Sequence, residues 1–332
     1  MTTPTDRTAT VPVQFQKPYR GSVAETSGLV TPPDDTGSPP TLHDDSAREE
    51  AHDIIERLVG IYHQLLAHRS LAPSAEVSET FGRLVRACIE PRSKQTVELV
   101  LSDPVLNKIA SSLLKLCSAG ETELELSWAG RICHLLTDSS AAQETLRAFP
   151  YYDNYARLSR LECANLVTLL PSDPTSIAFI GCGPLPLSSF CLSDRFPAAR
   201  INNIDHDVTA ISHAEKLSNA LGYDQVTFTH ASAAECGSLR TFDVVLMAAL
   251  VGMDQGEKMN LVRNLAAEMR PGAILCIRSA HSLRSLLYPT IEMSIHCLDI
   301  GLRPLLEVHP WHDVVNSTLF TSVERTDAGD DR

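Results

Sequence analysis

Residues 176–207 constrain the fold more than any other stretch of this chain. The apolar run Ile177–Ile180 leads into the turn Gly181-Cys182-Gly183, and a second apolar run ends at the acidic Asp205. Strand, glycine turn, helix and a second strand with an acidic end are typical of a nucleoside-binding α/β unit. Glycine lets the backbone approach a ligand closely, and the acid can accept hydrogen bonds from both ribose hydroxyls. We therefore expect a nucleoside site at this turn.

The same turn narrows the class of ligand. The sequence reads G-x-G rather than G-x-G-x-x-G, and Pro184 and Pro186 both lack the amide donor that a pyrophosphate needs. A nucleoside without a phosphate, of which S-adenosylmethionine (SAM) is the common example, fits better than NAD or FAD. The alternative is a glycine turn that only lets a helix pack against its strand.

Composition limits the partners. The 332 residues are 43% hydrophobic and carry a net charge of −13, so an acidic surface repels nucleic acid. No apolar run reaches the ~18 residues of a membrane span, and the N-terminus lacks the apolar core of a signal peptide. The nine cysteines form no CxxC pair and no zinc spacing. We expect a cytoplasmic protein with reduced thiols, no metal and no membrane partner; the oligomeric state is not predicted.

The pattern of polar and apolar residues divides the chain into four parts. Residues 1–44, rich in Thr, Pro, Ser and Asp, predict a disordered tail, as do residues 326–332. Residues 45–165 have apolar side chains at helical spacing and predict an all-helical domain. Residues 166–325 alternate strands with helices, which predicts a Rossmann-like, doubly wound sheet of the α/β class that binds SAM.

The sheet is expected to have seven strands. They are predicted at residues 176–181, 200–205, 226–230, 242–248, 273–278, 302–308 and 317–323. The helices between them are predicted to start near Pro186, Thr209, Gln255, Ser282 and His312. Ligands of such sheets bind beyond the carboxyl ends of the strands. The residues predicted there to bind SAM are Gly181, Cys182, Gly183, Pro184, Asp205, Ala248 and Leu250.

Taken together, the motifs resemble those of the nicotianamine synthase family. GPLPL, AALVGMD, RSAH and VVNS are specific, and their order agrees with the family. The matching segments are LCSAGETELE (116–125), FPYYDNY (149–155), IAFIGCGPLPL (177–187), NIDHD (203–207), DVVLMAALVGMD (243–254), EKMNLVRNLAAEMRPGAILCIRSAH (257–281), LYP (287–289) and HDVVNS (312–317). Cys182 stands where many members have Ser, and the tail before about residue 45 has no counterpart.

The resemblance implies a transferase reaction on SAM. An amine attacks the γ-carbon of the aminobutyrate arm, and methylthioadenosine leaves. Two condensations build a chain and a third aminobutyrate closes into an azetidine ring, so three SAM molecules become nicotianamine. The product is a metal chelator, and the family enzyme itself requires no metal.

Two glutamates are the candidate bases. Attack requires a neutral amine, whereas free α-amino groups are mostly protonated near pH 7, so a base in a cleft is useful. Glu121 and Glu125 are four residues apart and share one helical face, from which Glu123 points away. Their spacing alone favours solvated helix charges. The resemblance places an essential glutamate in this segment and favours catalysis, without choosing between the two.

Three of the chain's seven tyrosines, Tyr151, Tyr152 and Tyr155, form a second candidate group. Such clusters pack domain junctions, because they bury a ring while keeping a hydroxyl wet, and they also line clefts. We expect Tyr151 and Tyr152 to align the attacking amine and to attract the sulfonium, the latter by roughly 0.5–2 kcal/mol. Tyr155 is expected to contact substrate or to pack.

Substrate carboxylates need polar partners. Arg278, at the end of the fifth strand, is expected to bind one bidentately, although a structural ion pair is the alternative. His281 and Asn316 are further candidates for substrate binding, and His281 is equally suited to cap a helix.

Other functions share these SAM-binding motifs. A related enzyme would transfer one aminobutyrate, or cyclise SAM to azetidine-2-carboxylate. A SAM-dependent methyltransferase would release S-adenosylhomocysteine instead of methylthioadenosine. A non-catalytic SAM-binding protein would release neither.

Overall fold

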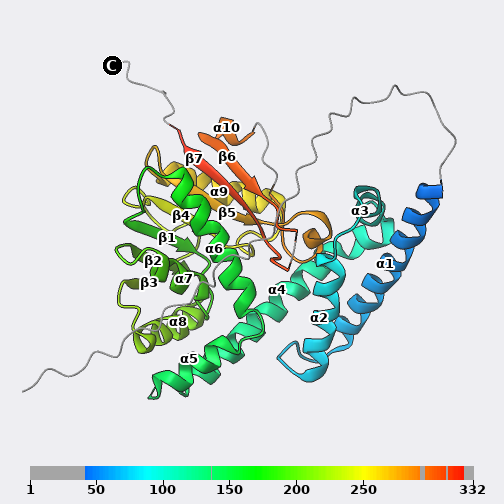
Figure 1. Ribbon diagram of the computed structural model, residues 1–332, viewed down its shortest axis with the longest axis horizontal. Helices are drawn as coiled ribbons and strands as arrows, with labels where there is room; N and C mark the ends of the chain where they lie inside the picture. The colour runs from blue at the N-terminus through cyan, green and yellow to red at the C-terminus, as the bar shows by residue number, and fades with distance from the viewer. Residues whose placement is uncertain (1–41, 136, 292–295, 312, 325–332) are drawn as a thin grey trace, which may run out of the picture.

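The computed structural model describes residues 42–135, 137–291, 296–311 and 313–324, and shows a helix-rich N-terminal part followed by a sheet (Figure 1). The predicted tails lie outside the described residues, except that residues 42–44 begin the first helix. The N-terminal helices are α1 (Leu42–Ala67), α2 (Ala75–Ile89), α3 (Lys94–Leu101), α4 (Pro104–Cys133), α5 (Ser139–Arg147) and α6 (Tyr152–Leu169).

The sheet confirms all seven predicted strands. They are β1 (Ser176–Ile180), β2 (Arg200–Asp205), β3 (Val226–His230), β4 (Val244–Met247), β5 (Ile274–Ser279), β6 (Leu302–Val308) and β7 (Ser317–Val323). Their order is β3-β2-β1-β4-β5-β7-β6, with β7 antiparallel to both β5 and β6 and the other pairs parallel. The strand order reverses at β1, so β1 and β4 flank the crevice where such sheets bind ligands.

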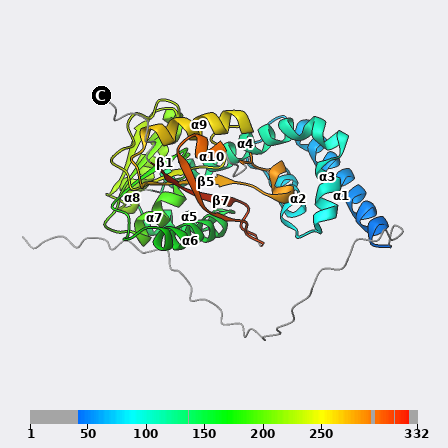
Figure 2. The same ribbon diagram turned by 90° about the horizontal axis from the view of Figure 1, so that it is seen from above.

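Helices cover both faces of the sheet, which explains why its strands read as nearly continuous apolar runs. The main covering helices after β1 are α7 (Leu187–Arg195), α8 (Val208–Leu221) and α9 (Gln255–Glu268). Figure 2 shows α9 on one side and α5, α6 and α7 on the other. One apolar cluster joins α5, α6, α7 and α8 to the strands, and a second joins α9 to the opposite face.

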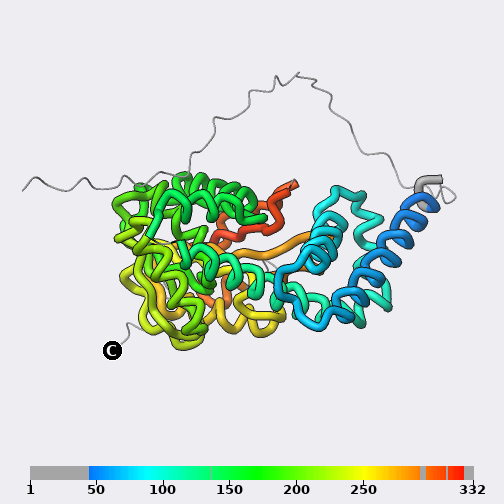
Figure 3. The backbone as a smooth tube through the Cα atoms, turned by 90° about the horizontal axis from the view of Figure 1, so that it is seen from below, coloured from blue at the N-terminus to red at the C-terminus, as the bar shows by residue number. Residues whose placement is uncertain are grey.

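A third apolar cluster holds the N-terminal part together. It contains buried residues of α1, α2, α3 and the first half of α4, together with Leu283, Leu286 and Leu287 of the segment after β5. That segment, which includes the short 3-10 helix η1 (Ser282–Leu286), reaches from the sheet toward the N-terminal helices (Figure 3).

The apolar packing on the sheet includes helices from before residue 165. The second half of α4, α5 and α6 pack on the sheet, because Ala129, Ile132 and Leu166 are buried in its cluster. Helical periodicity marks an apolar face but does not say which core will bury it. Helix α4 therefore belongs to both parts of the molecule.

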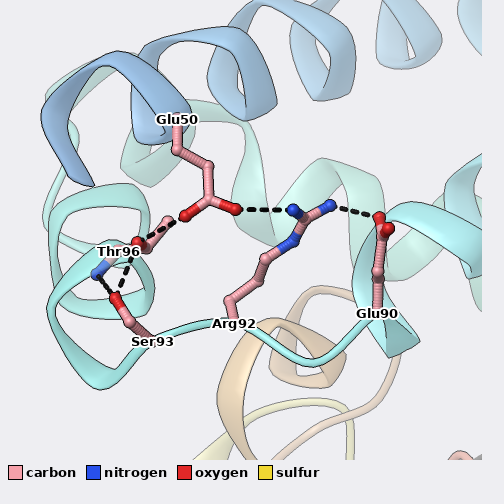
Figure 4. Close-up of polar contacts among 5 residues, drawn as sticks. All are labelled: Glu50, Glu90, Arg92, Ser93 and Thr96. Atoms are coloured by element: carbon pink, nitrogen blue, oxygen red, sulfur yellow. Dashed lines mark hydrogen bonds and ion pairs between the residues drawn. The ribbon is translucent and has the colours of Figure 1, made fainter. Parts of the chain in front are cut away.

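A polar network ties α1 to α3 (Figure 4). Glu50 of α1 accepts a hydrogen bond from Arg92 Nη1 at 2.6 Å and another from Thr96 Oγ1 at 2.7 Å. Arg92 also pairs with Glu90, and Ser93 caps α3 by accepting from the amide of Thr96. The Thr96 hydrogen bond is the main cause that lowers the pKa of Glu50, and the network fixes the start of α3 against α1.

Near the end of the chain one sequence-based expectation fails and one helix was not predicted. The helix predicted near His312 is absent from described residues 313–316, and His312 itself lies outside the described residues. Antiparallel β6 and β7 need only a loop between them. The short helix α10 (His296–Asp299) was not predicted. Within the described ranges, no helix combines the length and apolar character needed to cross a membrane.

Helix α4, which belongs to both parts of the molecule, gives a prediction for the free energy of unfolding. Leu113 of α4 is fully buried, whereas Val105 of the same helix is 49% exposed. Leu113→Ala should lower the free energy of unfolding by about 2–5 kcal/mol, because it leaves a cavity in the N-terminal core. Val105→Ala should change it by less than about 0.5 kcal/mol. Chemical denaturation measures both, and equal effects would contradict the assigned core.

Candidate active site

A cavity of about 780 Å³ lies where the carboxyl edge of the sheet meets α2 and α4. The sheet contributes the turn after β1, the end of β2 and the segment after β4. The N-terminal part contributes α2, α4 and the tyrosine junction. All the residues predicted to bind SAM line this cavity: Gly181, Cys182, Gly183, Pro184, Asp205, Ala248 and Leu250.

The turn after β1 has the backbone that the motif predicts. Gly183 adopts φ of +65°, which favours glycine, and its amide donates to Asp205 Oδ2 at 2.9 Å. A β-carbon at Gly183 would lie 2.6 Å from Glu125 Oε2, so only glycine lets α4 come this close. Asp205 Oδ1 accepts from the amide of Asp207 at 3.0 Å. Oδ1 also lies 3.4 Å from Nδ1 of His206, and Oδ2 has a second lone pair with which to bind a ligand.

The segment after β4 is held by a buried lysine. Lys258 of α9 is fully buried, and its Nζ donates to the carbonyl of Ala249 at 2.6 Å. Burial lowers the pKa of Lys258 to about 7. This hydrogen bond anchors the segment that includes Ala248 and Leu250, both of which line the cavity.

The two candidate bases meet two tyrosines in the middle of the cavity wall. Tyr155 Oη lies 2.6 Å from Glu125 Oε1 and 3.1 Å from Glu121 Oε1. Tyr288 Oη donates to Glu121 Oε2 at 2.7 Å. Because Tyr155 has a single hydroxyl proton, it donates to one carboxylate and can accept from the other only when that one is protonated. The geometry suits a pair of carboxyl groups that holds one proton.

The pKa values of the two glutamates also indicate that the pair holds one proton. Burial, followed by the charges of Glu121 and Asp205, raises the pKa of Glu125 to about 8. Burial also raises the pKa of Glu121, although the hydrogen bonds from Tyr288 and Tyr155 oppose the rise. Two carboxylates this close in a low-dielectric site do not both ionise readily. Near neutral pH the pair therefore offers one acceptor of a proton and one donor.

The structure pairs Arg278 within the protein. Its Nε and Nη2 bind the two carboxylate oxygens of Glu162, both at 2.8 Å, and Nη2 also donates to Ser188 Oγ at 2.7 Å. The face expected to grip a substrate carboxylate is thus already paired with a fully buried glutamate of α6. The alternative, a structural ion pair, describes this contact. Arg278 still lines the cavity, where its charge opposes the rise in pKa of both catalytic candidates.

Two further candidates, Tyr152 and His281, are not among the described residues that line the cavity. Tyr151 and Tyr155 line the cavity, but Tyr152 is not among its described lining residues and faces Arg147 instead. A helix places consecutive side chains in different directions, so only some of the tyrosine cluster can reach the site. The catalytic role expected of Tyr152 stays a prediction, and this placement does not favour it.

His281 is also outside the described cavity lining. Its Nδ1 pairs with Ser317 Oγ at 3.0 Å, and its ring lies 4.4 Å from that of His309. Burial and the neighbouring His309 and Arg284 lower the pKa of His281 to about 4. It precedes η1 but makes no side-chain cap hydrogen bond, so neither substrate binding nor capping describes it.

Asn316, in contrast, lines the cavity as predicted for a substrate contact. It is 7% exposed, and its Nδ2 has no hydrogen-bond partner among the described residues. A buried amide donor without a partner is costly, so a ligand acceptor would complete this site.

Sequence reasoning missed Tyr288 and Glu162. Tyr288 appeared only as part of LYP, a segment of the resemblance, and nothing local signals that its hydroxyl reaches Glu121. Glu162 sits in a helix whose other charges are exposed, so its burial depends on Arg278 arriving from β5. Within the described residues, no three His, Cys, Asp or Glu side chains form a group arranged to hold a metal.

Comparisons with known proteins point to one family. A family model described as "Nicotianamine synthase protein" matches residues 47–326. Nicotianamine synthase 2 of Oryza sativa subsp. japonica is 36% identical over 284 residues, covering 83% of this chain and 84% of its own length. Nicotianamine synthase 1 of Arabidopsis thaliana is 34% identical over 276 residues, covering 80% of this chain and 83% of its own.

Solved structures of MtNAS share the fold. The complex of MtNAS with MTA and tNA has a TM-score of 0.67 and 22% identity, and covers 86% of this chain and 100% of that chain. A mutant of MtNAS in complex with S-adenosylmethionine has a TM-score of 0.67 and 21% identity, with the same coverage.

The raised pKa of Glu125 predicts a pH-dependent cost in stability. The folded chain holds this proton up to about pH 8, whereas the unfolded chain loses it near the usual 4.5, so rising pH between these values destabilises the fold. Glu125→Gln should therefore be more stable than the wild type by about 1–3 kcal/mol at pH 8, and the gap should shrink toward pH 4.5. Chemical denaturation across this range measures it.

Glu123→Gln is the matched control, because Glu123 is exposed on the same helix. It should show no such pH-dependent gap, and a gap for Glu125→Gln that is constant with pH would contradict the raised pKa.

Proposed function

Because this chain belongs to the nicotianamine synthase family, whose model matches residues 47–326, we propose that it condenses the aminobutyrate groups of three SAM molecules into nicotianamine and releases methylthioadenosine. One observation carries the proposal for this chain. The adenosyl-type turn and a protonatable carboxyl pair face each other, with Glu125 Oε2 against Gly183. A sulfonium bound at the turn thus lies beside a base.

The sheet edge holds the adenosyl end in this proposal. Asp205 is fixed by the amides of Gly183 and Asp207 and accepts the ribose hydroxyls with its free lone pairs. Gly181 and Gly183 bring the backbone close to the ligand, and the segment anchored by Lys258 closes the other side. These contacts are common to SAM enzymes, so they do not select which sulfonium carbon reacts.

The carboxyl pair takes up the proton that the reaction releases. An amine nitrogen attacks the γ-carbon, the bond between that carbon and sulfur breaks, and its electron pair goes to sulfur to give neutral methylthioadenosine. The nitrogen gives its extra proton to the ionised carboxylate of the Glu121–Glu125 pair. Tyr155 bridges the two carboxyl groups, so the pair can accept this proton at either residue.

Other residues of the wall position the substrate. We assign the unpaired Nδ2 of Asn316 to a substrate carboxylate, because the site offers it no other acceptor among the described residues. Tyr151 lines the cavity beside the pair and is assigned to hold the amine in line with the γ-carbon. The Arg278–Glu162 pair acts indirectly, by keeping a positive charge near the carboxylates.

Product analysis from SAM alone tests the proposal. Incubation of the full chain with SAM, followed by mass spectrometry, should yield nicotianamine and methylthioadenosine. Free azetidine-2-carboxylate, or the product of a single transfer, would support the smaller-product alternative instead. S-adenosylhomocysteine as by-product would indicate a methyltransferase, and calorimetric binding of SAM without turnover would indicate a non-catalytic protein.

Glutamine variants test the carboxyl pair. Glu121→Gln and Glu125→Gln should each lower kcat for methylthioadenosine release by about 10²–10⁴, the usual range for loss of a general base. Glu123→Gln, exposed on the same helix, should keep wild-type kcat. Full activity of both paired-glutamate variants would exclude them as the base.

The pH profile should carry the signature of the same pair. A carboxyl group accepts a proton only when ionised, so wild-type kcat/KM should rise with pH as the pair ionises, and burial places this rise above the range of an ordinary carboxyl group. In Glu121→Gln only Glu125 remains to ionise, without the neighbouring charge, so the midpoint of the rise in residual activity should change. A profile that is unchanged in this variant would contradict the coupling.

A further inference from the structure

One contact in the cavity wall has no part in the chemistry above. Gly120 lies on α4, one residue before Glu121, and faces Phe81 of α2; both line the cavity. A β-carbon at Gly120 would lie 2.3 Å from Cζ, 2.6 Å from Cε2 and 3.1 Å from Cε1 of Phe81. The first two distances are shorter than non-bonded carbon atoms tolerate. The ring of Phe81 therefore occupies space that only glycine leaves open.

The contact lies in the part of the cavity away from the adenosyl turn. This part, here called the acceptor lobe, is lined by α2 and α4 through Val77, Ser78, Phe81, Val85, Cys117 and Ser118. Glu121 directly follows Gly120 on α4, and Glu125, about one turn further along the same helix, approaches the turn at Gly183. In the proposed reaction the sulfonium occupies the turn side, so the rest of the attacking molecule extends into the acceptor lobe.

We propose that Phe81, seated against Gly120, sets the depth of the acceptor lobe and thereby the length of the acceptor that can present its amine to SAM. The inference rests on the proposed function and assigns a specificity-determining role to these two residues. The acceptors of successive transfers differ in length by one aminobutyrate unit. A shallower lobe admits the short acceptor and excludes the longer one, so synthesis stops early.

Gly120→Ala should make the acceptor lobe shallower. The added methyl displaces the ring of Phe81, and the ring moves into the cavity because a side chain turns more easily than a packed helix shifts. Helix α4 is fixed on both sides of this point by the fully buried Leu113 and Ala129. Glu121 and Glu125 should accordingly stay in place and catalyse the first transfer.

The experiment measures the molar ratio of methylthioadenosine to nicotianamine formed by the full chain from SAM. Complete synthesis gives three methylthioadenosine molecules per nicotianamine. In Gly120→Ala the ratio should rise by about tenfold, since steric exclusion on the scale of one methylene in an apolar pocket discriminates at least this much. The mass of a shorter, single-transfer product should appear at the same time.

Two further variants distinguish a change in the acceptor lobe from a general loss of structure. Gly130→Ala changes the same helix where nothing lies within 4 Å of the added β-carbon, so the ratio should stay at the wild-type value. Phe81→Leu combined with Gly120→Ala should bring the ratio back toward wild type, because leucine lacks Cε1, Cε2 and Cζ. Thermal unfolding of each variant shows whether it is folded.

The outcomes are distinct. An unchanged ratio in Gly120→Ala overturns the inference and leaves the proposed function standing. A fall in methylthioadenosine and nicotianamine in equal proportion means that α4 has moved, and also overturns it. If the wild-type chain itself forms no nicotianamine from SAM, the proposed function is wrong. The inference about Phe81 and Gly120 then fails with it.

Discussion

Two carboxyl groups, one buried and one partly buried, lie within hydrogen-bonding distance of one tyrosine, and the rest of the site depends on this constraint. Glu121 and Glu125 meet Tyr155 on a wall that also faces Asp205. Such a cluster of acids is unfavourable by itself, since desolvation disfavours every charge in it. It persists because Tyr288 and Tyr155 donate hydrogen bonds and because Arg278 is held nearby by Glu162. The same desolvation raises the pKa values of Glu121 and Glu125 toward the range in which a carboxyl group transfers protons near neutral pH.

Helix α4 makes this arrangement rigid. Its first half is buried among α1, α2 and α3, and its second half is buried against the sheet. The two glutamates lie between these anchored ends, so neither can relax toward solvent without disrupting a core. Gly183 then allows the sheet's turn to approach Glu125, and Gly120 allows Phe81 to approach α4 on the other side. Two glycines thus place the carboxyl pair between a nucleoside-type turn and an apolar lobe.

Much of the sheet could be predicted because its signals are local. Continuous apolar runs and glycine turns act within a few residues, so all seven strands were predicted, and the residues predicted at their carboxyl ends line the cavity. Contacts between distant residues could not be predicted. Arg278 binds Glu162, 116 positions away along the chain. Tyr152, unlike Tyr151 and Tyr155, is not among the described residues that line the cavity.

The sequence by itself determined the fold class, the nucleoside-type turn, the family resemblance and the pair of glutamates on one helical face, because each depends on spacing along the chain. Only the tertiary structure decided that Glu125 is buried and Glu121 partly buried, that Tyr155 and Tyr288 bind them, and that α4 serves two cores. Desolvation and hydrogen bonding across the junction depend on which surfaces meet in space. For that reason the protonation of the two glutamates depends on how the N-terminal helices pack against the sheet, which spacing along the chain does not determine.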